Sequence, residues 1–430
     1  MVPRTGLESR EPTLRRHRRD LVAANIGNAL EWFDWNVYAI FAPFFAAQFF
    51  HADNTLSALL STLAVFAVGF LMRPLGGYLF GRLADRRGRK ISLALSMTLT
   101  AGGSLLIAVS PTYAAVGVLA SVLLVVARMA QGLAHGGEVG ASYTYVAEIA
   151  PPSRRGLWSS TGYVSITLGT ILATGTGALL TTVLSGDQMR SWGWRIPFLL
   201  GAVLGVYAIV LRRRLTESAA YQHKSAAAQP RTSLLAQLWR HRKAALLNIG
   251  LTMGGTVGFY TWVVFAPSYA SSVKGMDPSA ALIAGVLAQC VYLVVLPIAG
   301  HLSDRFGRKP VYYVFAIGYV VLPFPLDWLV QGEFWQLLLA MSIALAVMAC
   351  SSAIIGAMVS ELFPTSVRAT GVGLPYSIAV ALFGGTAPYL NTWLTGIGYH
   401  SVFLGYLVAM CAVTVLCLWR MPETRGKELT

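Results

Sequence analysis

The chain has 430 residues, of which 55% are hydrophobic and only 12% are charged. Soluble domains carry about 25% charged residues, so the composition excludes a soluble enzyme and a disordered chain, as does a mean hydropathy of +0.60. In a soluble protein a net charge of +15 would suggest nucleic-acid binding, but the long apolar segments predict an all-α protein that crosses a membrane many times.

Twelve apolar segments, each long enough to span a bilayer, follow one another along the chain. They are centred near residues 37, 69, 100, 126, 170, 203, 258, 290, 320, 348, 382 and 409. A polar stretch separates the sixth segment from the seventh. The sequence therefore predicts an N-terminal tail (1–19), a six-helix half (20–214), a linker (215–242), a second six-helix half (243–420) and a C-terminal tail (421–430).

Two short motifs occur once in each predicted half. GRLADRRGRK at 81–90 is repeated as GHLSDRFGRK at 300–309, which is 219 residues later. EIAPPSRRG at 148–156 is repeated as ELFPTSVRA at 361–369, at an offset of 213 residues. Two pairs at nearly the same offset indicate a parallel repeat of six plus six helices, an architecture common among secondary transporters.

The basic residues show the expected orientation in the membrane. Lys and Arg concentrate in the termini, the linker and the loops on the same side, whereas the opposite loops hold only Arg190, Arg195 and Lys274. Short cytoplasmic loops are rich in Lys and Arg. We therefore expect a multi-pass protein of the cell (inner or plasma) membrane with both termini and the linker in the cytoplasm.

The repeated loops also carry charges that topology alone does not need. An aspartate in each GRLADRRGRK-type loop can sit at a neighbouring helix N-terminus or pair with an arginine. For Asp85 we expect such a contact across the two halves, with Arg154 or Arg155 as partner. The alternative is that the loops only determine topology. The residues predicted to gate the cytoplasmic side are Asp85, Arg89, Arg154, Arg155, Glu148, Asp304, Arg308, Glu361 and Arg368.

All charged residues well inside predicted spans belong to the first half. They are Glu31, Asp34, Arg73, Arg128 and Glu138. Charge at bilayer depth is costly unless it is paired, so these side chains should face the interior of the bundle. Two polar stripes at helical spacing, one in each of spans one and four, suggest a hydrated pathway. Their members are Asn28, Glu31, Asp34 and Tyr38, and Arg128, Gln131, His135 and Glu138.

A binding wall needs a few placed polar groups in an apolar lining. Arg73 and Arg128 are the embedded cations that could hold a carboxylate, and helix packing is the alternative role for Arg73. His135 could titrate near neutral pH or simply pack. The predicted substrate-binding residues are Arg73, Arg128, Gln131, His135, Tyr38, Tyr260, Trp262, Tyr376 and Asn391. For the aromatic members, packing is again the alternative.

Motifs of other chemistries are missing from the sequence. It contains no Gly-x-x-x-x-Gly-Lys-Ser/Thr motif, no zinc-ligand spacing and no serine-elbow context. We therefore expect neither an enzyme nor a primary pump, and no cofactor or metal. An ion channel would need a broken pore loop with a carbonyl filter, for which the sequence shows no candidate.

The duplicated loop resembles the signature of the major facilitator superfamily. The segments GNALEWFDWNVY, GFLMRPLGGYLFGRLADRRGRK, ARMAQGLAHGGEVG and SWGWRIPFLLGAV are similar to its metabolite:proton symporter branch. Within that branch the chain looks most like carriers of α-ketoglutarate, then of citrate, while carriers of proline or betaine and of shikimate share the same skeleton. His135 departs from the branch, whose α-ketoglutarate carriers place a small or apolar residue there.

The resemblance implies a transporter that works by alternating access and imports its substrate with protons, usually as a monomer. It implies that Asp34 and Arg128 couple protonation to the conformational change, although both could instead form a static ion pair. Glu31 could belong to the same proton pathway, and Glu138 to that pathway or to a gate. The expected substrate is a small organic acid anion, such as α-ketoglutarate or citrate. The alternatives are a zwitterionic osmolyte such as proline or betaine, and shikimate.

Overall fold

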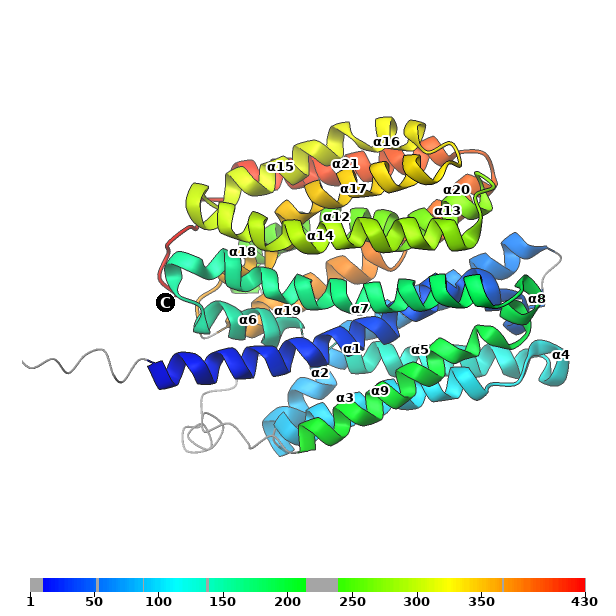
Figure 1. The fold of residues 1–430 in the computed structure, drawn as a ribbon. Coiled ribbons are helices and arrows are strands. Elements are labelled where there is room, and N and C mark those ends of the chain that lie inside the picture. Colours follow the sequence, from blue (N-terminus) through cyan, green and yellow to red (C-terminus); the bar gives the residue numbers. More distant parts are fainter. Residues whose placement is uncertain are drawn as a thin grey trace, which may run out of the picture.

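The computed structural model describes residues 11–51, 54–87, 89–136, 139–213, 239–365 and 367–429, and these residues form helices and connecting turns without a β-strand. In Figure 1 most of the helices before residue 214 lie below most of those after residue 238. The lower half consists of α1 (Glu11–Phe49), α2 (Thr55–Arg87), α3 (Arg89–Val109), α4 (Tyr113–Val116), α5 (Val118–His135), α6 (Val139–Ile149), η1 (Pro152–Arg154), α7 (Arg155–Val183), α8 (Gly186–Gln188), η2 (Met189–Gly193) and α9 (Arg195–Arg213).

The upper half repeats this sequence of long and broken helices. It consists of α12 (Arg242–Phe259), η3 (Tyr260–Phe265), α13 (Ala266–Ser272), α14 (Pro278–Phe306), α15 (Arg308–Val321), α16 (Pro323–Leu329), α17 (Phe334–Ser352), α18 (Ile355–Ser360), α19 (Arg368–Ala379), η4 (Val380–Gly384), α20 (Ala387–Gly396) and α21 (His400–Arg420). The π-helical turns η3 and η4 each break one of its long rods. Such turns occur often at functional sites.

The predicted spans correspond to these helices. The twelve predicted centres fall inside α1, α2, α3, α5, α7, α9, α12, α14, α15, α17, η4 and α21. Among the described residues, eight helices are long and apolar enough to cross a membrane by themselves, and the pair α15 and α16, bent by 58°, would make a ninth. The α-helical membrane fold is confirmed. Most of the predicted linker lies outside the described residues, so its limits stay a prediction.

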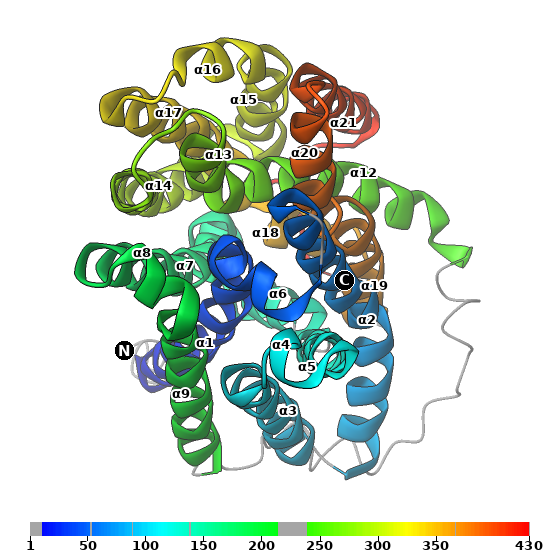
Figure 2. The same cartoon turned by 90° about the vertical axis from the view of Figure 1, so that its right-hand side faces the viewer.

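The helices of both halves run along a common long axis. The start of α1 and residues 421–429 lie at the same end, on the left of Figure 1. We call this end the tail end and the opposite one the far end. Figure 2 looks along the axis and shows α7 beside α14 and α2 beside α19, where the halves meet.

Glycines bring α2 and α5 very close together. A Cβ on Gly132 would overlap the carbonyl oxygen of Gly69, and a Cβ on Gly136 would overlap that of Arg73. Small residues allow such backbone contact between membrane helices, where close packing and not hydrophobic expulsion drives association. This contact fixes Arg73 on α2 against the face of α5 that carries Arg128.

Candidate functional site

Two buried arginines share one aromatic surface in the centre of the first half. The Cζ atom of Arg73, on α2, lies 4.0 Å from the ring centroid of Trp35 and 4.1 Å from that of Phe70. The Cζ atom of Arg128, on α5, lies 4.2 Å from the centroids of Trp35 and Tyr38. We call these five residues the arginine cage. Cation–π contact supports both guanidinium groups without neutralising them.

Each of the two guanidinium groups has N–H donors that remain available to a ligand. Within the described part of the chain, Nε and Nη2 of Arg73 and of Arg128 make no hydrogen bond. Buried donors are normally satisfied, and guanidinium groups bind carboxylates through two parallel N–H groups. Two such groups on the same indole therefore form a place where an anion would be stabilised.

Asp34 is connected to Arg128 through an amide. Arg128 Nη1 donates to Gln131 Oε1 at 2.8 Å, and Gln131 Nε2 donates to Asp34 Oδ2 at 2.8 Å. The hydroxyl of Ser104, on α3, donates to Asp34 Oδ1 and accepts from Gln131 Nε2. The two predicted coupling residues therefore belong to one buried network, in which Gln131 stands between the charges. Sequence reasoning missed Ser104, which carries no charge.

His135 and Glu31 lie beside the cage. The imidazole of His135 stacks on Trp35 with centroids 5.2 Å apart, and its Nδ1 is 3.9 Å from Glu31 Oε2. His135 thus both packs and faces a buried carboxylate. Glu138 lies outside the described residues, so its role stays a prediction.

The second-half candidates separate into three places. Tyr260, in η3, meets Phe70 edge to face at 5.3 Å and so adjoins the arginine cage. Tyr376, on α19, instead meets the hydroxyl of Tyr143 at 3.4 Å. Trp262 and Asn391 line a different, small cavity in the second half. In this structure Trp262 and Asn391 thus lie apart from Tyr260 and Tyr376, and a role of these residues in substrate binding stays a prediction.

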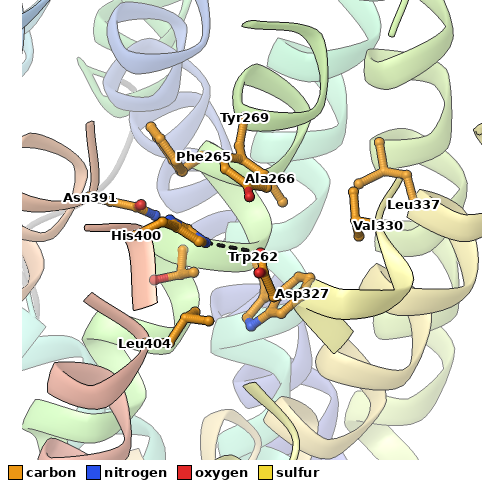
Figure 3. A pocket seen from close by; sticks show the side chains of 11 residues that line it. Trp262, Phe265, Ala266, Tyr269, Asp327, Val330, Leu337, Asn391, His400 and Leu404 are labelled. Carbon is orange, nitrogen blue, oxygen red and sulfur yellow. Dashed lines mark hydrogen bonds and ion pairs between the residues drawn. The ribbon is translucent and has the colours of Figure 1, made fainter. Parts of the chain in front are cut away.

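Figure 3 shows the side chains that line this second cavity, several of which come from α13, α16, α20 and α21. Its walls are mostly aromatic and aliphatic, and its polar side is the pair His400 Nε2 and Asp327 Oδ1, 2.9 Å apart. His400 also stacks on Tyr269 at 4.5 Å, and its Nδ1 is 2.9 Å from the hydroxyl of Thr395. These contacts join α13, α16, α20 and α21, so the pair stabilises the far end of the second half.

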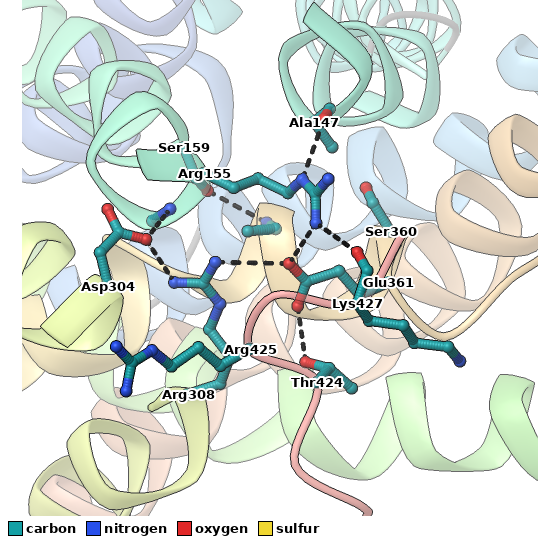
Figure 4. A network of polar contacts seen from close by, with 12 residues as sticks. Ala147, Arg155, Ser159, Asp304, Arg308, Ser360, Glu361, Thr424, Arg425 and Lys427 are labelled. Carbon is teal, nitrogen blue, oxygen red and sulfur yellow. Dashed lines mark hydrogen bonds and ion pairs between the residues drawn. The ribbon is translucent and has the colours of Figure 1, made fainter. Parts of the chain in front are cut away.

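At the tail end, buried ion pairs connect the two halves (Figure 4). Arg155 Nη1 lies 3.0 Å from Glu361 Oε1, which Arg308 Nη2 also approaches at 3.3 Å. Arg308 pairs with Asp304 at 2.8 Å. Glu148, 213 residues before Glu361, makes the reciprocal pair with Arg368 at 2.8 Å. The internal repeat thus places two related ion pairs across the interface. Arg155 and Arg368 are 213 residues apart, as are Glu148 and Glu361, and each arginine pairs with the glutamate of the other half.

Asp304 makes the helix contact that the loop motif suggested. Its two carboxylate oxygens accept from the backbone N–H groups of Gly156 and Leu157, each at 2.8 Å, at the start of α7 in the other half. Arg155 joins the ionic network, whereas Arg154 is exposed to solvent. The side chains of Asp85 and Arg89 lie outside the described part, so the equivalent contact of the first loop stays a prediction.

Residues after α21 complete this network, and the sequence analysis did not foresee it. Thr424 Oγ1 donates to Glu361 Oε2 at 2.5 Å, and the carbonyl of Lys427 accepts from Arg155 Nη1 at 3.0 Å. Glu423 accepts from the backbone N–H groups of Arg308 and Lys309 at the start of α15. Burial alone would raise the pKa of Glu423, but these backbone hydrogen bonds outweigh it and hold the pKa below the ordinary 4.5.

No metal site is apparent in the described ranges. No group of three or more His, Cys, Asp or Glu side chains there could hold an ion. The polar features are instead a cationic cage in one half and ion pairs that connect the halves at one end. Together with the internal repeat, they define a membrane carrier built from two similar helical halves.

The Major Facilitator Superfamily model matches residues 24–291 and 264–430, and the chain belongs to this superfamily. It is 39% identical to the alpha-ketoglutarate permease of Escherichia coli over 96% of both chains. It is 33% identical to the citrate-proton symporter of Klebsiella pneumoniae, covering 91% of this chain and 89% of that one. It is 31% identical to the proline/betaine transporter of Salmonella typhimurium, covering 96% and 85%.

Among solved structures, the fold is similar to the partially occluded inward-open xylose transporter XylE of E. coli. The TM-score is 0.74 at 21% identity, covering 95% of this chain and 98% of that one. The two-half fold predicted from the repeat is therefore confirmed, and the chain is a transporter and not an enzyme.

Proposed function

We propose that this chain is a proton-coupled symporter that imports a small organic acid anion, resembling α-ketoglutarate or citrate, by alternating access. The observation that carries the proposal is the arginine cage, where Arg73 and Arg128 each have Nε and Nη2 donors without a hydrogen-bond partner among the described residues, next to the indole of Trp35. A dicarboxylate could engage one guanidinium with each end. The similarity to the alpha-ketoglutarate permease and the citrate-proton symporter supports the same substrate class.

Coupling to protons follows from the network around Asp34. Ionised Asp34 accepts hydrogen bonds from Ser104 and Gln131, and Gln131 in turn holds Arg128. A proton on Asp34 would remove the charge that orients Gln131, so Arg128 would become free to follow the substrate. Glu31, facing His135, and Glu138 are proposed members of the same proton pathway.

The tail end is proposed to be the cytoplasmic gate. Lys and Arg concentrate in the loops and termini at this end, which favours a cytoplasmic location in the inner or plasma membrane. Opening the gate would separate the ion pairs across the interface. We propose that a monomer carries out the whole cycle, since both halves of the interface come from one chain.

A zwitterionic osmolyte is the second candidate, favoured by the similarity to the proline/betaine transporter. It fits the cage less well, because a quaternary ammonium needs aromatic faces and the guanidinium groups already lie over Trp35, Phe70 and Tyr38. An ion channel would require a conducting path, whereas the described interface is closed by ion pairs at the tail end.

Calorimetry on purified protein with α-ketoglutarate, citrate and betaine tests the substrate class. We expect binding of at least one carboxylate and weak or no binding of betaine. Flux into proteoliposomes tests the mode of transport, and we expect saturable accumulation driven by ΔpH. Tight betaine binding without carboxylate binding would reject the organic-acid assignment, and ohmic conductance would reject a carrier.

A further inference from the structure

Three tyrosine hydroxyls meet where the two halves face each other. Tyr143, on α6, and Tyr163, on α7, come from the first half, and Tyr376, on α19, comes from the second. The hydroxyl of Tyr376 lies 3.4 Å from that of Tyr143 and 3.5 Å from that of Tyr163. We call these residues the tyrosine triad. No sequence pattern pointed to Tyr143 or Tyr163.

Two members of the triad occupy equivalent positions in the two halves. Tyr163 and Tyr376 are 213 residues apart, the same offset that relates Arg155 to Arg368. Each tyrosine follows its arginine by eight residues, about 12 Å along a helix. Tyr143 has no tyrosine counterpart, because the equivalent position is Gly356. A Cβ there would lie 3.2 Å from the ring of Tyr143, so the glycine leaves room for that ring.

Aromatic contacts place the triad between the arginine cage and the tail-end ion pairs. On one side, Arg73 lies over Trp32 at 5.9 Å, Trp32 meets Phe259 at 5.9 Å, and Phe259 meets Tyr163 at 6.4 Å. On the other side, Gly356 also faces Ser159, one turn along α7 from Arg155. A substrate moving from the cage to the tail end would therefore pass the triad.

The hydroxyl contacts are weak in the present state. Hydroxyl hydrogen bonds are usually 2.7–2.8 Å long, so separations of 3.4 and 3.5 Å leave the three O–H groups poorly satisfied. Because they come from both halves, separation of the halves at the tail end would break even these contacts. The three O–H groups would then line the space between the halves, each able to donate to a carboxylate oxygen.

We infer that the tyrosine triad is a second anion-binding station, which receives the carboxylate of the substrate after it leaves the arginine cage. The inference rests on the proposed organic-acid transport. Phenol groups carry no positive charge, so they bind an anion less tightly than guanidinium groups do. A neutral station of this kind lets the anion pass without being held.

The experiment compares the triple variant Y143F/Y163F/Y376F with Tyr312→Phe. The phenylalanines keep the rings and remove only the hydroxyls. Tyr312 is the matched control, because its buried hydroxyl donates to the carbonyl of Leu251 within the second half. For each protein we would measure equilibrium binding of α-ketoglutarate by calorimetry, and exchange of radiolabelled α-ketoglutarate across proteoliposomes without a proton gradient.

We expect the triple variant to bind α-ketoglutarate within about twofold of the wild type. Its exchange should be slower by tenfold or more, since a hydrogen bond to a charged group is worth about that factor. The control should exchange normally. Wild-type exchange by the triple variant would overturn the inference, as would an equal slowing of the control or a loss of binding that matches the loss of rate. If the wild type itself bound no carboxylate, the proposed function would fail instead.

Discussion

Removing the charge of Glu361 should open the tail end, and the structure allows the size of the effect to be worked out. Glu361 is buried and lies between Arg155 and Arg308, both also buried. In Glu361→Gln the two guanidinium groups lose their shared carboxylate while they stay away from water. Breaking a buried ion pair by removing one partner costs about 3–5 kcal/mol. Opening the tail end would hydrate the arginines, so this cost falls on the closed state.

The expected shift in the balance of closed and open states is therefore at least about a hundredfold. Glu148→Gln is the matched control, because Glu148 is the repeat counterpart of Glu361. Its side chain is 40% exposed, although that of its partner Arg368 is buried, so water compensates part of the lost charge and the effect should be smaller than at Glu361. The same chemical change at related positions should thus have clearly different effects.

Spin labels can report the opening. Ser153, in η1, and Arg305, near the end of α14, are exposed positions of different halves at the tail end. Double electron–electron resonance between labels at S153C and R305C, in a background without the native cysteines, gives their distance distribution. We expect a marked shift to longer distances for Glu361→Gln and a clearly smaller shift for Glu148→Gln. Overlapping distributions for Glu361→Gln and the wild type would refute the assignment of these ion pairs as a gate.

Three further outcomes follow from the same structure. Asp34→Asn should abolish ΔpH-driven accumulation in proteoliposomes but preserve exchange, and unimpaired accumulation would exclude Asp34 as the essential proton carrier. Arg128→Lys keeps the charge but loses the planar pair of donors, so carboxylate binding measured by calorimetry should weaken about 10- to 100-fold; unchanged affinity would remove Arg128 from the binding site. The pKa of Glu423 is lowered in the folded protein, so its ionised carboxylate stabilises the fold at pH values above the ordinary pKa of 4.5. This stabilisation is lost as the pH falls through the lowered pKa. Thermal unfolding at a series of pH values should therefore show an acid-side loss that Glu423→Gln lacks, and identical profiles would argue against this role.

The sequence predicted those parts of the site that depend on local pattern. The apolar segments located the helices, and the repeated loop correctly suggested that an aspartate such as Asp304 would sit at a helix N-terminus. Embedded charge identified Arg73 and Arg128, because such residues are rare in a bilayer and have to face the interior.

Other parts of the site depend on contacts between segments that are far apart in the sequence, which a local pattern does not predict. Trp262 and Tyr260 are two residues apart in the π-helical turn η3, so they point to different sides, one toward a separate cavity and one toward the cage. Neutral residues such as Ser104 and Tyr143 are marked in the sequence neither by an embedded charge nor by a repeated motif. Their importance arises only from partners 70 and 233 residues away.

Residues 421–427 pack against both halves at the tail end, and this affects the order in which contacts form during synthesis. Arg155 binds the carbonyl of Lys427, which the ribosome adds 272 residues later. The complete closed arrangement thus cannot form on a nascent chain that has only its first half inserted. During that interval Arg155 lacks Glu361 as well, since this residue also belongs to the second half. The ion pairs and hydrogen bonds that close the tail end therefore form only after the second half has been made. A translation product that stops after the first half lacks these contacts.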